Sequence, residues 1–171
     1  MPVGVWMVSR GAPRGGSLKG MYSVAEPNIL LTRIDNRLIH GQVVTQWNAV
    51  VGANLILVAN DGVAKSDVRQ RLMDMAAPEG VAMRYFSLQK NIDVIHQASP
   101  DQLIFLVVDN PTDVLALVRA GVPIKKVNVG NMHMAERRRQ VTASVAVDDA
   151  DVAAFKELRD LGVELEIQRV P

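Results

Sequence analysis

The sequence predicts an α/β domain built on an open, twisted, mostly parallel β-sheet with helices on both faces. Three observations favour this fold class. Short apolar runs alternate with amphipathic stretches from residue 27 onward, which is the pattern of strand–helix repeats. The run at residues 102–109 is almost wholly apolar, as expected for a strand covered on both faces. No internal repeat or linker interrupts the chain, so we expect one domain at residues 27–171.

The expected elements follow one another in order. Strands are predicted where apolar residues cluster, at residues 28–35, 54–61, 81–87, 102–109, 125–131, 142–148 and 164–170. Helices are predicted where apolar residues recur at helical spacing, at residues 39–52, 65–80, 89–99, 110–122 and 149–163. Gly52 and Gly121 are suited to end two of these helices. Ser66 is suited to begin the helix within residues 65–80, and Pro78 and Gly80 are expected to lie beyond its end. Ligands of such sheets bind beyond the carboxyl ends of the strands, so the polar residues after each apolar run are the candidate site.

The first 26 residues have a different character. Gly, Pro, Ser and Arg dominate "MPVGVWMVSRGAPRGGSLKGMYSVAE", and no strand or helix period is visible. The apolar stretch precedes the arginines, which is the reverse of the order in a signal peptide. Two interpretations remain open: a start codon assigned too early, with Met21 as the true start, or a remnant of cloning. We expect residues 1–26 to be poorly ordered and to lie outside the domain.

Composition excludes several classes of function. The net charge is +1 and aromatic residues make up 4%, so neither a strong basic field nor a base-stacking platform points to nucleic acid. There is no cysteine, which excludes a thiolate metal site, and the three histidines lack metal-ligand spacing. No phosphate-binding glycine motif follows the first strand. We therefore expect no nucleic acid, no metal and no cofactor.

The segment "RIDNRLIHGQ" at residues 33–42 carries the chemistry. His40 is a neutral nucleophile near pH 7. Arg33 and Arg37 are permanent cations whose planar forks match phosphoryl oxygens. If a helix begins here, its first N–H groups add further donors for an anion. A nucleophile, a charge clamp and an amide cradle are the parts that a phosphohistidine intermediate needs.

Other residues complete the candidate site or compete with it. We expect Asp35 to fix which imidazole nitrogen carries the proton, and Gly41 to let the backbone approach a ligand closely. His133 follows another predicted strand and is a candidate for the same crevice, whereas His96 fits a surface or packing position. The run "ERRRQ" at residues 136–140 fits a solvated loop or a docking surface. A hydrogen-bonded structural histidine remains the alternative interpretation of His40.

The segment "RIDNRLIHGQV" resembles the active-site segment of the IIB components of the mannose/fructose/sorbose family of the bacterial sugar phosphotransferase system. That family typically carries R-I-D-[DE]-R-L-[IV]-H-G-Q-V near its N-terminus. The likeness continues through "VANDGVAKSDVRQRLMDMAAPEGV", "NPTDVLALVRAGVPIKKVNVGNM" and "VAVDDADVAAFKELRDLGVELEIQRVP". It covers residues 27–171 in the same order and spacing.

The resemblance implies a cytoplasmic protein, peripherally associated with the membrane permease, that accepts a phosphoryl group from a IIA component. It passes the group to a sugar bound by membrane components IIC and IID. His40 matches the phosphorylated histidine, which reacts through Nδ1, and Arg37 matches the arginine that contacts the phosphoryl oxygens. The resemblance requires no metal or nucleotide. The remaining substrate-binding candidates are Arg33, Asp35, Asn36, Gly41, Gln42, Asn131 and His133.

The sequence departs from the family pattern at two site positions. Asn36 stands where the family often has a second acid, and Asn131 stands where many members have Gly. We expect Asn131 to tolerate a positive φ, so that the turn survives. The segment "NVGNMH" is most similar to the N-acetylgalactosamine and galactosamine branch, although mannose stays open as the sugar. A homo-oligomer also stays open, as does a non-catalytic anion-binding or regulatory module that keeps the cradle and transfers nothing.

Overall fold

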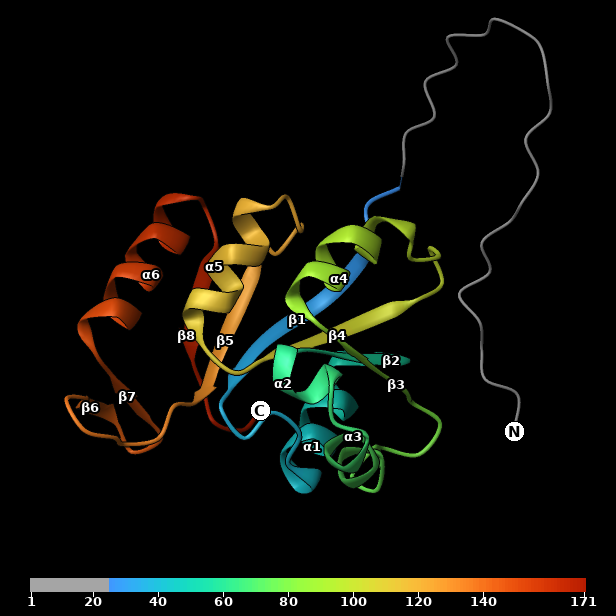
Figure 1. Ribbon diagram of the computed structural model, residues 1–171, viewed down its shortest axis with the longest axis horizontal. Helices are drawn as coiled ribbons and strands as arrows, with labels where there is room; N and C mark the ends of the chain where they lie inside the picture. The colour runs from blue at the N-terminus through green and yellow to red at the C-terminus, as the bar shows by residue number, and fades with distance from the viewer. Residues whose placement is uncertain (1–24) are drawn as a thin grey trace, which may run out of the picture.

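The structure, a computed structural model, describes residues 25–171. Residues 1–24 of the extension expected at residues 1–26 therefore lie outside the described residues. Six parallel strands form one open sheet in the order β3-β2-β4-β1-β5-β8. They are β1 (Asn28–Asp35), β2 (Leu55–Ala59), β3 (Ala82–Phe86), β4 (Leu103–Val108), β5 (Lys126–Asn131) and β8 (Glu164–Ile167). The predicted fold class is confirmed (Figure 1).

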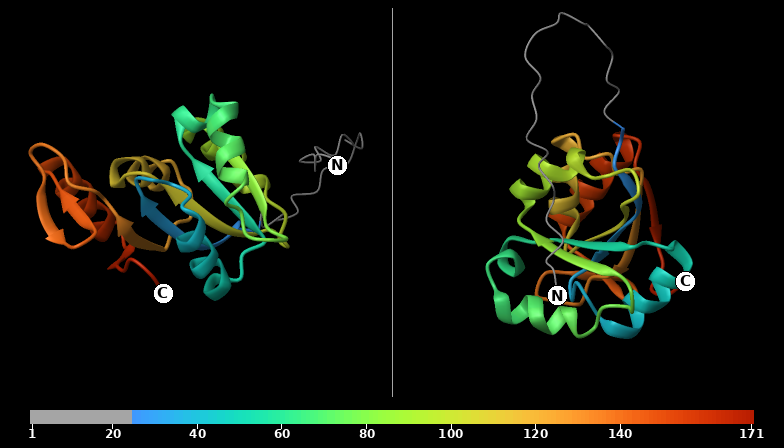
Figure 2. Two further views of the ribbon diagram at one scale, coloured as in Figure 1. Left: turned by 90° about the horizontal axis from the view of Figure 1, so that it is seen from below. Right: turned by 90° about the vertical axis from the view of Figure 1, so that its right-hand side faces the viewer.

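Helices connect the strands and cover both faces of the sheet (Figure 2). They are α1 (Gly41–Val51), α2 (Asp61–Ala64), α3 (Asp67–Asp74), α4 (Leu88–Val94) with the short 3-10 helix η1 (Ile95–Gln97), α5 (Pro111–Arg119) and α6 (Asp149–Asp160). Polar side chains cap five of these helices by accepting from an N–H three residues ahead: Asn60, Ser66, Ser87, Asn110 and Asp148. The predicted cap at Ser66 is confirmed, and α3 ends at Asp74, so that Pro78 and Gly80 lie beyond its end as expected.

Alternation along the strands divides the core into two clusters. On β1, Ile34 packs with one cluster and Leu31 with the other, because successive side chains of a strand face opposite ways. The larger cluster lies under α5 and α6, and the smaller one lies under α1 and α3. The central strand β4 is buried along most of its length, as its apolar sequence predicted.

A small hairpin departs from the prediction. Residues 142–148 were expected to form one strand of the main sheet. Instead β7 (Val145–Val147) pairs antiparallel with β6 (Arg139–Thr142) as a separate two-stranded sheet. Glu136 and Arg137 of the basic run form an exposed turn before β6. Arg138 pairs with Asp151 at 3.2 Å, and Arg139, the first residue of β6, pairs with Asp149 at 3.0 Å. These ion pairs hold the hairpin against the start of α6.

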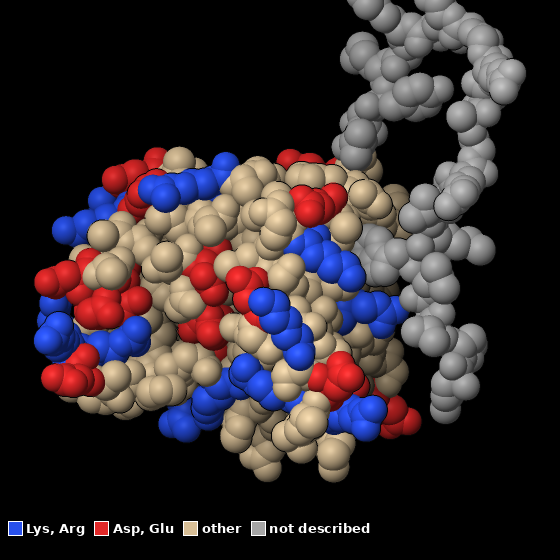
Figure 3. All heavy atoms as spheres, viewed as in Figure 1, with Lys and Arg blue, Asp and Glu red and all other residues tan. Residues whose placement is uncertain are grey.

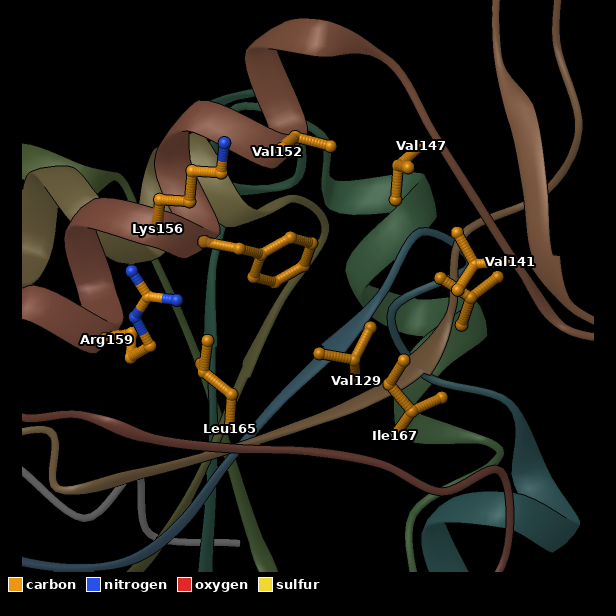
Figure 4. Close-up of a pocket in the computed structure, with 10 residues that line it drawn as sticks. Val129, Val141, Val147, Val152, Lys156, Arg159, Leu165 and Ile167 are labelled. Atoms are coloured by element: carbon orange, nitrogen blue, oxygen red, sulfur yellow. The ribbon is translucent and has the colours of Figure 1, made fainter.

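An apolar hollow separates the hairpin from the sheet edge. It has a volume of about 350 Å³ and lies between β8, α6 and the hairpin, with Phe155, Leu165 and Ile167 among the residues that line it (Figure 4). Lys156 and Arg159 of α6 lie at its rim. This hollow contains none of the predicted site residues.

Arg33 is a buried cation near the carboxyl end of β1, with 2% of its surface exposed. Its guanidinium donates to Asn128 Oδ1 on β5 at 2.5 Å and to the carbonyls of Gln168 and Arg169 at 3.2 and 3.1 Å. It also lies over the Trp47 ring, 5.4 Å from the centroid. Burial lowers the pKa of Arg33, and the charge of Asp35 opposes that shift. One side chain thus joins β1, β5, α1 and the C-terminal segment.

Gly130 leaves the space that the Arg33 side chain occupies. A Cβ built at Gly130 would lie 2.0 Å from the central guanidinium carbon of Arg33. That distance is far below any real contact, so a side chain at position 130 would force the cation out of its place. The glycine in "NVGN" is therefore required by close packing.

Acidic side chains gather near the start of α5 (Figure 3). Burial, and secondarily the charge of Asp109, raises the pKa of Asp113 to about 6, with a smaller effect from Asp61. Asn60 donates to Asp109 at 2.9 Å, and Asn110 donates to Asp113 at 3.0 Å. These amides partly offset the repulsion between the carboxylates.

We predict that Gly130→Ala destabilises the protein by about 3–5 kcal/mol, because it displaces a buried charge from its partners. Chemical denaturation followed by circular dichroism measures the change. Gly41→Ala is the matched control, since its Cβ would meet Ala76 at an ordinary 3.8 Å. A Gly130→Ala variant as stable as the control would contradict the packing argument.

We also predict that Asp113 makes stability depend on pH. Its folded pKa of about 6 lies above the ordinary value of 3.8, so the folded state holds the proton more tightly than the unfolded state does. Stability should therefore fall as pH rises from about 4 through 6. Asp113→Asn should raise the melting temperature more at pH 7.5 than at pH 4.5. The exposed Asp93→Asn serves as control, and an equal shift at both pH values would count against the prediction.

Candidate functional site

A tight turn carries the chain from β1 to α1. Leu38 N–H donates to Asp35 O at 2.8 Å, and Leu38 adopts a φ of 62°, which is rare for a residue other than glycine. The Leu38 and Ile39 side chains are buried in the smaller core cluster. This anchoring compensates for the unfavourable backbone and leaves the next residue, His40, facing solvent.

His40 is the N-cap residue of α1, with extended backbone angles. Its carbonyl accepts from Val44 N–H at 3.0 Å, while its exposed imidazole makes no capping hydrogen bond. The first N–H groups of an α-helix lack acceptors within the helix and form its positive end. The first turn of α1 contains no acidic residue. The exposed imidazole therefore lies at a helix start whose N–H donors suit an anion, and its role as nucleophile stays a prediction.

Asp35 holds the two arginines of the segment. Its carboxylate is 1% exposed and accepts from Arg33 at 3.1 Å. It also accepts from the Arg37 backbone N–H, Nε and one terminal nitrogen, each at 3.1 Å. Both oxygens are thus occupied by arginine. The expectation that Asp35 orients the imidazole is wrong in this structure. The Asp35 carboxylate faces the guanidinium groups of Arg33 and Arg37 and forms its hydrogen bonds with those two residues.

The two arginines have different environments. The Arg37 side chain is 31% exposed, and Asp35 fixes its fork at the same turn that carries His40. Arg33 lies behind Asp35, with its donors engaged by the protein itself. The geometry therefore offers Arg37, rather than Arg33, to an anion at the surface.

Asn36 and Asn131 meet across the site. Asn131 Nδ2 donates to Asn36 Oδ1 at 2.7 Å, and the Asn36 N–H donates to the Asn131 carbonyl at 3.0 Å. These bonds tie the turn to the carboxyl end of β5. Asn131 does not have a positive φ, so the conformational reason expected for tolerating it was wrong. His133 lies two residues further on and is exposed.

Gly41 and Gln42 line an open hollow of about 500 Å³ at the start of α1. Met75 and Ala76, which follow α3, form the opposite wall. No group of three or more acidic or histidine side chains within residues 25–171 is arranged to hold a metal ion. None of the helices over the same residues is long and apolar enough to cross a membrane.

Sequence reasoning missed the framework behind the site. Trp47 donates through Nε1 to the Arg169 carbonyl at 3.2 Å, the same oxygen that accepts from Arg33. Asn128 fixes the other side of the Arg33 guanidinium. The one available signal in the sequence was Gly130 inside a predicted strand, because a glycine there often marks a place where another group packs closely against the backbone. The carbonyl partners, which come from the far end of the chain, leave no mark in the sequence.

Comparisons with known proteins agree on one family. A family profile described as "PTS system sorbose subfamily IIB component" matches residues 29–171. The chain is 54% identical over 145 residues to the N-acetylgalactosamine-specific phosphotransferase enzyme IIB component 2 of Escherichia coli, which covers 85% of this chain and 92% of that one. It is 42% identical over 167 residues to the mannose-specific EIIAB component of Escherichia coli, covering 93% of this chain and 52% of that longer one.

A solved structure shows the same arrangement. The crystal structure of the N-acetylgalactosamine-specific IIB component 1 from Escherichia coli superposes with a TM-score of 0.82 at 46% identity, covering 84% of this chain and 95% of that one. Sequence and fold therefore lead to the same conclusion. The chain belongs to the sorbose-subfamily IIB components of the sugar phosphotransferase system.

Proposed function

We propose that His40 is the residue that carries the phosphoryl group. The single observation that supports this most is an exposed imidazole at the start of α1, next to an arginine whose fork is fixed by a buried carboxylate. An imidazole without a capping bond is available as nucleophile. Family membership makes phosphoryl transfer the reaction to test, since IIB relatives are named as phosphotransferase components.

The proposed reaction has two steps. In the first, the P–N bond of a phosphohistidine on a IIA component breaks, and a P–N bond forms at Nδ1 of His40. In the second, that bond breaks and the phosphoryl group passes to a sugar hydroxyl, whose proton is released. A phosphoimidazole is already an activated donor, so this chain contributes positioning and electrostatic stabilisation.

Three groups have separate roles in this proposal. Arg37 contacts the phosphoryl oxygens and stabilises the charge that moves during transfer. The Gly41 and Gln42 N–H groups extend the cradle at the helix start. Asp35, Arg33 and Asn128 act behind them as positioning residues, because they touch the arginine framework rather than the ligand. Asn36, Asn131 and His133 line the rim.

The sugar and the partners belong to the same proposal. Relatives at 54% and 46% identity are named as N-acetylgalactosamine-specific, which makes that sugar the first to test, before galactosamine and mannose. The donor is a IIA component, and the acceptor sugar is presented by the membrane components IIC and IID. The protein would then work in the cytoplasm, at the inner side of the permease.

We predict that His40→Ala and Arg37→Ala fail in different ways. The first removes the attacking atom, so no phosphoryl-enzyme should form at any donor concentration. The second keeps the nucleophile and should slow transfer about 10²–10³-fold, the usual effect of losing one preorganised donor. Arg37→Lys should recover only part of the rate, because an ammonium cannot form the bidentate fork.

The assay is transfer from phosphorylated IIA, followed by intact mass and by the acid lability of the bound group. His96→Ala, on the exposed η1 turn, is the control and should be phosphorylated like the unmodified protein. Stoichiometric, acid-labile phosphorylation of the His40→Ala protein would exclude His40 as carrier. A protein that binds phosphate but accepts no phosphoryl group from any donor would instead be the non-catalytic module.

A further inference from the structure

Three large apolar side chains are exposed along α3 and at the residue that follows it. Val68, Leu72 and Met75 are 70%, 62% and 84% exposed. Their spacing of four and three residues places them on one face of the helix. The opposite face already contributes Met73 to the core. The stripe, meaning these three residues, is therefore left over after the fold has buried what it needs.

The stripe leads directly to the candidate site. Met75 forms one wall of the hollow whose other wall is Gly41 and Gln42, the two residues after His40. Ala76, the next residue, would meet a Cβ at Gly41 at 3.8 Å. The end of α3 and the start of α1 are thus in contact. The Met75 end of the stripe therefore lies beside the two residues that follow His40.

We propose that this stripe is the docking surface for the protein that donates the phosphoryl group, an inference that rests on the proposed function of His40. Transfer between two histidines requires the donor's surface to cover His40 and its surroundings. The Met75 wall of the hollow lies inside that area, and the rest of the stripe extends it along α3. In the mannose-specific EIIAB relative an A component shares the chain with the B component, so the partner is a protein surface.

The chemistry of the stripe fits a brief encounter. Three apolar side chains form a small patch, in the range used by transient complexes that must form and separate. Arg71 lies on the same side of α3 and is exposed. The donor surface should therefore be apolar, with an acidic group opposite Arg71. Small apolar contacts with a charged neighbour favour fast exchange over tight binding.

The test separates docking from chemistry by using two donors. The variant Val68→Asp/Leu72→Asp adds charge to two exposed positions of the stripe that do not line the hollow, and melting curves check that it folds. With phosphorylated IIA as donor, we expect its KM to rise about tenfold or more, and its rate at saturating donor to stay within about threefold. With phosphoramidate, a small donor that needs no docking surface, its rate of phosphorylation at His40 should equal that of the unmodified protein.

A matched control uses the exposed Leu161 at the far end of α6. This side chain is 52% exposed and lies outside the site, so Leu161→Asp should leave the KM for phosphorylated IIA unchanged. An unchanged KM in the double variant would overturn the docking proposal. So would slow reaction with both donors, because the substitutions would then act on His40 itself.

Two further outcomes concern other occupants of the stripe. If light scattering shows a dimer that Val68→Asp/Leu72→Asp dissociates, a second copy covers the stripe and the proposal is wrong. A second outcome is an unchanged KM for IIA with slower transfer to the sugar. The membrane components would then use the stripe, and the proposal that the donor docks there would be wrong. Absence of phosphorylation at His40 in the unmodified protein with either donor would refute the proposed function itself.

Discussion

The carboxylate of Asp35, placed between Arg33 and Arg37, is the interaction on which the site depends. It is almost fully buried, and all four hydrogen bonds that it accepts come from the two arginines. Two cations and one anion leave this cluster with one positive charge in excess. Of these three residues, only Arg37 extends to the surface. An incoming anion can therefore balance the excess charge at the Arg37 guanidinium, whereas Arg33 is out of its reach. A phosphoryl group beside His40 would complete the set.

Arg33 connects the Asp35 cluster to β5, α1 and the C-terminal segment. Its guanidinium needs Gly130 for space, Asn128 and two C-terminal carbonyls as acceptors, and Trp47 as a ring to lie against. Removing one partner of a buried charge leaves the others uncompensated, which is more costly than losing the pair as a whole. Residues from four separate elements therefore fix one turn. The strained Leu38 backbone is tolerated because this framework and the core beneath it leave the turn little alternative.

Periodicity predicted the sheet and its helices, since most strands of the parallel sheet are apolar runs followed by a polar residue. Periodicity did not predict the hairpin at residues 139–147, because its apolar residues look like those of a strand in the main sheet. The ion pairs of Arg138 and Arg139 that hold it to α6 join residues that sequence spacing does not relate. The sequence could nominate His40 and Arg37 as candidates because their proposed chemistry depends on neighbouring residues of one short segment. Asp35 was misjudged because its partner depended on which way the turn faced, which only the tertiary structure decides.

Asn36 and Asn131 show how two departures from a family pattern can be one feature. Considered alone, Asn36 loses an acid and Asn131 adds a side chain where glycine is common. The structure joins them by a 2.7 Å hydrogen bond in which Asn131 is the donor. A glycine at 131 could not donate, and a charged acid at 36 would bring a negative charge near the phosphoryl position. The amide pair keeps the turn tied to β5 and also leaves the positive charge of Arg37 less opposed. The same two residues therefore tether the turn without adding a charge beside Arg37.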